Sequence, residues 1–133
     1  MMRSLKFAML GMLTLFVVAC TAPIMQVESQ PFPDETQNLS MDQLQDAIIK
    51  AASSREWTVK KLSTGKLMAT YARRDHLAKV EIDFSQQEFS ILYVDSTNLK
   101  YNGGTIHKNY NRWVNNLKVD IQREVAAKIA ATS

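Results

Sequence analysis

The segment from Asp95 to Trp113 concentrates side chains that could act on or bind another molecule. A hydrolytic site needs an acid, a nucleophile and a base, and Asp95, Ser96 and His107 could supply these groups. A structural role explains the same residues, because Asp and Ser commonly end strands and organise turns. The sequence therefore favours a protein without catalytic residues, and a hydrolase that uses His107 is kept as an alternative.

The same segment is better suited to recognition. Aromatic rings and arginine are the residue types enriched at the energetic centres of protein interfaces. We predict a partner-binding surface formed by Tyr101, His107, Tyr110, Arg112 and Trp113. Tyr110 and Trp113 also fall on the apolar stripe of an expected helix, so a place in the core is the alternative for these two residues.

A second group of candidate residues is basic and surrounds an expected hairpin: Lys60, Lys61, Lys66, Arg73 and Arg74. If these side chains converge, they could bind anionic lipid headgroups or lipopolysaccharide phosphates. The alternative is an ordinary charged sheet edge, which prevents strand-to-strand aggregation. Aromatic residues do not alternate with the basic ones as binders of single-stranded nucleic acid require, so we expect no nucleic-acid partner.

Metal and cofactor chemistry find little support in the sequence. The two histidines, His76 and His107, lack a second ligand at a metal-binding spacing such as H-x-x-x-H. Glycine-rich phosphate loops, nucleophile elbows and nucleotide-binding fingerprints are also missing. We therefore expect neither a metal site nor a cofactor.

The single cysteine, Cys20, follows an apolar run near the N-terminus. Arg3 and Lys6 precede the uncharged residues 7–19, which is typical of a secretory signal and shorter than the ~20 residues of a membrane-spanning helix. The run ends in Val-Val-Ala-Cys (Val17–Cys20), which resembles the lipobox of bacterial lipoproteins. The resemblance implies cleavage before Cys20, a diacylglyceryl group on its sulfur and acylation of the new amino group. The alternative is a small buried cysteine in an uncleaved helix.

This resemblance also implies a location. Several acyl chains hold a protein firmly on a membrane, whereas one binds reversibly. The residue after Cys20 is Thr21 rather than Asp, which by analogy with other lipoproteins favours the outer membrane over the inner one. The rest of the chain would then face the periplasm. Without Arg3 and Lys6, the 16 basic residues fall to 14 against 13 acidic ones, so the net charge falls from +3 to +1 and does not indicate nucleic-acid binding.

Residues 20–38 are expected to form the lipidated cysteine and a flexible tether. All three prolines, Pro23, Pro31 and Pro33, lie here among polar residues without sustained periodicity. A flexible coil of this length reaches on the order of 25 Å. The folded periplasmic domain is therefore expected over residues 39–133.

The elements of that domain follow from capping and periodicity. Ser40 and Gln43 have the spacing of a capping box, and apolar residues at helical spacing follow to about residue 53. Apolar and polar residues then alternate in four segments, which predicts strands over residues 56–62, 67–73, 79–84 and 89–95. A long helix is expected to begin near His107.

Short connections between these strands require antiparallel pairing. We therefore predict an α+β fold: a four-stranded antiparallel meander with an N-terminal and a C-terminal helix packed on one face. The segments Thr64–Tyr71, Ala78–Phe84, Phe89–Tyr101 and Ile106–Leu117 are similar to a pattern in small, uncharacterised bacterial lipoproteins. The resemblance covers most of Ser40–Ile121 and implies this fold but no catalytic residues. The sequence thus predicts a membrane-anchored binding or envelope-assembly module that contacts another envelope protein. A lipoprotein that binds anionic lipid is the alternative.

Overall fold

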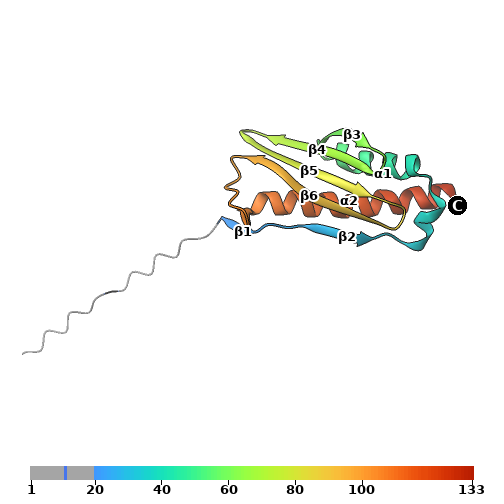
Figure 1. Ribbon diagram of the computed structural model, residues 1–133, viewed down its shortest axis with the longest axis horizontal. Coiled ribbons are helices and arrows are strands. Elements are labelled where there is room, and N and C mark those ends of the chain that lie inside the picture. Colours follow the sequence, from blue (N-terminus) through green and yellow to red (C-terminus); the bar gives the residue numbers. More distant parts are fainter. Residues whose placement is uncertain (1–10, 12–19) are drawn as a thin grey trace, which may run out of the picture.

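The computed structural model describes residues 11 and 20–133 (Figure 1). The predicted signal sequence, residues 1–19, lies outside the described residues except for Gly11. The helical elements are η1, a short 3-10 helix (Asp34–Asn38), α1 (Met41–Ser53) and α2 (Lys108–Thr132). The strands are β1 (Thr21–Pro23), β2 (Val27–Pro31), β3 (Thr58–Ser63), β4 (Lys66–Arg73), β5 (His76–Phe84), β6 (Glu88–Thr97) and β7 (Thr105–His107).

The predicted α+β class is confirmed, but the sheet is larger than a four-stranded meander. Strands β3 to β6 form the expected antiparallel meander, and β2 adds a fifth strand beside β6, giving the order β2-β6-β5-β4-β3. The short strands β1 and β7 form a separate antiparallel pair. Both additions come from pairings between residues far apart in the chain, such as Val27 with Ile91 and Ala22 with Ile106.

The prediction of a flexible tether is wrong for residues 21–38, which fold as part of the domain. This segment forms β1, β2 and η1. The side chains of Val27, Phe32 and Thr36 are buried, and the ring of Phe32 stacks on that of Phe89 with centroids 4.9 Å apart. Prolines do not prevent this arrangement, because edge strands and turns tolerate a residue without a backbone N–H.

The start of α1 confirms the predicted capping box. The Ser40 hydroxyl accepts a hydrogen bond from the backbone N–H of Gln43 at 3.1 Å, and the Gln43 side chain accepts one from the Ser40 N–H at 2.9 Å. Two backbone donors at the helix start are thereby satisfied. The apolar residues Leu44, Ala47 and Ile48 are buried, as their helical spacing indicates.

Both helices cover the same face of the sheet (Figure 1). On β5, the residues Ala78, Val80, Ile82 and Phe84 are buried and alternate with partly exposed polar ones. In α2, the buried residues recur every three or four positions and pack into the same core: Tyr110, Val114, Leu117, Ile121 and Val125. Within residues 20–133, no helix covers the opposite face of the sheet.

A strand, a turn and a loop lie together at one end of the molecule. Figure 1 shows β1, the turn between β4 and β5, and the loop between β6 and β7 at this end, whereas the C-terminus lies at the other. Hydrogen bonds join the turn to the loop: His76 Nδ1 lies 2.8 Å from the carbonyl oxygen of Asn98, whose side chain donates to Asp75 at 2.7 Å. We call this the β1 end and define it by residues 20–23, 74–76 and 98–108.

Within residues 20–133, neither helix is both long and apolar enough to cross a membrane.

Candidate functional site

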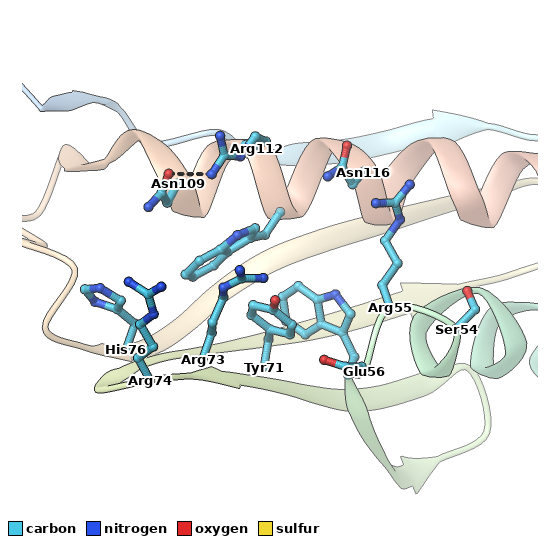
Figure 2. Close-up of a pocket in the computed structure, with 12 residues that line it drawn as sticks. Ser54, Arg55, Glu56, Tyr71, Arg73, Arg74, His76, Asn109, Arg112 and Asn116 are labelled. Carbon is cyan, nitrogen blue, oxygen red and sulfur yellow. Dashed lines mark hydrogen bonds between the residues drawn. The ribbon is translucent and has the colours of Figure 1, made fainter.

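A cleft of about 560 Å³ opens between the end of α1, strand β4 and the first half of α2 (Figure 2). This volume is within the range of small-molecule sites, roughly 300–1,000 Å³. We call it the arginine cleft because four arginines line it. Its lining residues are Ser54, Arg55, Glu56, Trp57, Tyr71, Arg73, Arg74, His76, Asn109, Arg112, Trp113 and Asn116.

Three aromatic rings in contact form the floor of the arginine cleft. Tyr71 lies between the two tryptophans, with its ring centroid 5.3 Å from that of Trp57 and 4.9 Å from that of Trp113. Trp57 and Tyr71 are buried, whereas Trp113 is only half-buried. The indole of Trp113 is therefore the aromatic surface that a bound molecule would contact, and the other two rings hold it in place.

Arg55 is fixed at one end of the arginine cleft. Its Nε donates to the carboxylate of Asp120, which is 6% exposed and also accepts a hydrogen bond from Arg123 at 3.3 Å. This bond raises the pKa of Arg55, with burial acting in the opposite direction. The guanidinium keeps further N–H groups beyond the one bound to Asp120. Figure 2 shows the side chain extending toward Asn116 on α2.

The other three arginines differ from Arg55, which is paired with Asp120. Within residues 20–133, Arg73, Arg74 and Arg112 form no ion pair with an acidic side chain. Arg112 instead donates to the Asn109 side chain at 2.7 Å (Figure 2). Interaction with the Tyr71 hydroxyl, and more weakly with Glu56, raises the pKa of Arg73. Glu56 is the one acid among the described lining residues, so the cleft has a strongly positive surface.

The arginine cleft combines residues from both predicted groups. Arg112 and Trp113 come from the predicted partner-binding surface, and Arg73 and Arg74 come from the basic group. Sequence reasoning placed these residues in two separate sites, because the packing of α2 against the end of β4 cannot be read from periodicity. It also missed four lining residues that carry the chemistry of the site: Arg55, Trp57, Tyr71 and His76.

The rest of the predicted partner-binding surface does not gather in the arginine cleft. Tyr101 is 45% exposed and stacks on Tyr93 with ring centroids 4.1 Å apart. Tyr110 is fully buried, as the alternative expected, and burial raises the pKa of its phenol. His107 caps α2, since its Nδ1 accepts a hydrogen bond from the N–H of Asn109 at 3.0 Å.

The predicted basic group is divided between two ends of the sheet. Lys66 begins β4 and lies 3.8 Å from the Glu81 carboxylate, whereas Arg73 ends the same strand. A strand rise of about 3.3 Å per residue puts these two residues about 23 Å apart. Lys60 and Lys61 are exposed on the edge strand β3, where positive charge opposes pairing with other chains.

The residues of the alternative hydrolytic site have structural partners. Asp95 accepts a hydrogen bond from the backbone N–H of Ser96 at 2.8 Å, and the Ser96 hydroxyl bonds to that of Tyr93 at 2.8 Å. In the described part of the chain, no hydrogen bond links Ser96 to His107. Residues 20–133 also contain no cluster of three or more His, Cys, Asp or Glu side chains that could bind a metal ion.

The arrangement of the arginine cleft suits recognition of an anion. A guanidinium group presents two parallel N–H donors to a carboxylate or phosphate, and it also stacks on aromatic rings. Four such groups around a half-exposed indole can bind an anionic group and an adjoining apolar or planar part of the same molecule. In comparisons with known proteins, no family model, curated protein or solved structure matches this chain.

Proposed function

We propose that this protein is an outer-membrane lipoprotein, acylated at Cys20 and facing the periplasm, that binds another envelope component without catalysis. The arginine cleft is the binding site, and a carboxylate or phosphate of the partner is the group it holds. The observation that carries the proposal is that Arg73, Arg74 and Arg112 lie beside Trp113 and form no ion pair within residues 20–133.

The charge of the arginine cleft supports an anionic ligand. Like charges held close together repel one another, and a bound anion removes that repulsion. A cleft lined by one sign of charge also concentrates ligands of the opposite sign. The acid that lines the cleft, Glu56, offsets only part of the charge of the four arginines.

The position of Cys20 agrees with the lipoprotein part of the proposal. Cys20 is exposed and directly precedes β1 at one end of the molecule. The residue that would carry the acyl group is therefore accessible at the surface of the domain. The sequence Val17–Cys20 remains the basis for proposing the modification itself.

Intrinsic fluorescence can test the binding site directly, because the chain has two tryptophans and both line the arginine cleft. We expect inorganic pyrophosphate, added to the mature protein in a nonionic detergent, to change tryptophan emission in a saturable way. Replacing Arg112 by Gln removes one charged donor and should weaken binding about tenfold. Arg73→Gln should have a similar effect.

Lys61→Gln is the matched control, since it removes one positive charge from an exposed residue outside the cleft. This variant should bind pyrophosphate like the unaltered protein. Equal weakening in all three variants would mean that net charge, rather than the arginine cleft, attracts the anion. An absent or non-saturable response in the folded, unaltered protein would refute the assignment of the cleft as an anion site.

A further inference from the structure

We infer that the β1 end of the domain rests directly on anionic lipid headgroups of the membrane that holds the acyl chains. The inference depends on the proposed acylation of Cys20. It adds the orientation of the domain and the surface that meets the bilayer.

Within residues 20–133, no spacer separates Cys20 from the folded domain. The carbonyl oxygen of Cys20 accepts a hydrogen bond from the backbone N–H of Lys108 at 2.9 Å. Directly after it, Thr21 pairs with His107 and Pro23 with Thr105. A sulfur carried by this residue can reach the headgroup region only if the surrounding surface lies there too.

Further hydrogen bonds, from one side chain and from the backbone, hold β1 to the rest of the domain. Asn111 on α2 donates to the carbonyl oxygen of Pro23 at 2.9 Å and accepts from the N–H of Met25 at 2.8 Å. The N–H of Ile24 donates to the carbonyl oxygen of Gly104 at 3.0 Å. These bonds fix the direction in which Cys20 leaves the domain, so the anchor also sets the tilt of the domain.

The surface of the β1 end around Cys20 is rich in exposed basic side chains. Exposed basic residues of the β1 end are Arg74, Lys100 and Lys108, and its exposed acid is Asp75, with Asp95 close to Lys100. The arginine cleft reaches this end through Arg74. A basic side chain near an anionic bilayer strengthens association about fivefold, so the excess of positive charge favours anionic headgroups.

The β1 end also carries an exposed aromatic residue. Tyr101 is 45% exposed, and its ring is supported by stacking on Tyr93. Tyrosine with an apolar ring and a polar hydroxyl is suited to the membrane interface. The loop that carries it is ordered by backbone hydrogen bonds, from Asn102 to Thr105 at 2.9 Å and from His107 to Leu99 at 2.8 Å.

Fluorophores at the two ends of the molecule can test this orientation. We propose labelling the acylated protein at Gly104→Cys or at Ser133→Cys and reconstituting it in vesicles of phosphatidylethanolamine and phosphatidylglycerol. A Cβ at Gly104 meets no atom within 4 Å, so this substitution should not disturb the fold. The length of α2, about 38 Å, separates the two positions. A lipid with a nitroxide on its headgroup should quench the label at position 104 several-fold more than the label at position 133.

Two further measurements separate the inference from the proposed function. Intact mass and vesicle flotation report whether Cys20 is acylated, and absence of acyl mass would refute the anchor and the inference together. Equal quenching at both positions in an acylated, floating protein would refute the orientation alone.

Omitting phosphatidylglycerol, or replacing Lys100 and Lys108 by Gln, should reduce quenching at position 104. Unchanged quenching in both cases would refute the role of anionic headgroups, and the pair Lys60→Gln and Lys61→Gln is the control for charge.

Discussion

At the scale of single residues, the structure assigns opposite roles to side chains that look alike in the sequence. Arg55 is held by the buried carboxylate of Asp120, whereas Arg112 donates to the neutral side-chain amide of Asn109. Tyr101 is exposed and Tyr110 is fully buried, although both are tyrosines in the same predicted surface. Burial and partners, rather than residue type, therefore decide which side chains are accessible to another molecule.

Asp120 should be important for stability, because its carboxylate organises two arginines while being almost inaccessible to solvent. We expect Asp120→Ala to lower the free energy of unfolding by about 1–3 kcal/mol, since hydrogen bonds to charged groups are lost. Urea unfolding followed by circular dichroism measures this change. Asp46→Ala removes an exposed acid of α1 and is the control, with little change expected. Equal stability of the two variants would contradict a structural role for Asp120.

Tyr110 offers a test of burial that depends on pH. Its hydroxyl is buried without a hydrogen-bond partner among the described residues, and burial raises the pKa of the phenol in the folded protein. A raised folded pKa stabilises the protein below the unfolded pKa of about 10, and this contribution is lost as the pH rises above it. We expect Tyr110→Phe to be as stable as the parent at pH 7 and to lose less stability above pH ~10. Parallel alkaline unfolding curves for the two proteins would contradict this account.

At the scale of elements, the sequence predicted what depends on local pattern. The capping residues of α1, the alternation in β5 and the apolar stripe of α2 all lie within one element and were read correctly. β1 and β2 were missed, because three to five residues show no clear periodicity and their partners are more than 50 residues away. Edge strands of this kind are stabilised by pairing and burial rather than by intrinsic preference.

Phe32 tests whether the segment between Cys20 and α1 is a folded element. Its ring is buried against Phe89. Replacing Phe32 by Ala should cost about 3–5 kcal/mol of unfolding free energy, as for other buried aromatic residues. Pro33→Ala changes the exposed neighbour and should have a much smaller effect. A flexible tether would instead make both substitutions neutral, as measured by urea unfolding.

At the scale of the whole molecule, the arginine cleft exists only because distant segments meet. The residue types that form it were visible in the sequence, and Arg73, Arg74, Arg112 and Trp113 were selected on that basis. Their convergence depends on how α2 crosses the end of β4 and on the return of the chain after α1, where Arg55 and Trp57 lie. Neither relation can be predicted from the local spacing of apolar residues. The candidate residues could therefore be predicted from the sequence, but the site could not.

The pairing of β1 with β7 also has a mechanical consequence. If Cys20 is the anchor, any force between the membrane and a bound partner passes through this three-residue ribbon before it reaches the five-stranded sheet. The ribbon would separate first, because it has few hydrogen bonds, and the freed residues 21–26 would then form a connector that spans at most about 20 Å at 3.3 Å per residue. The protein could thus lengthen its attachment under tension while its core and its arginine cleft stay folded.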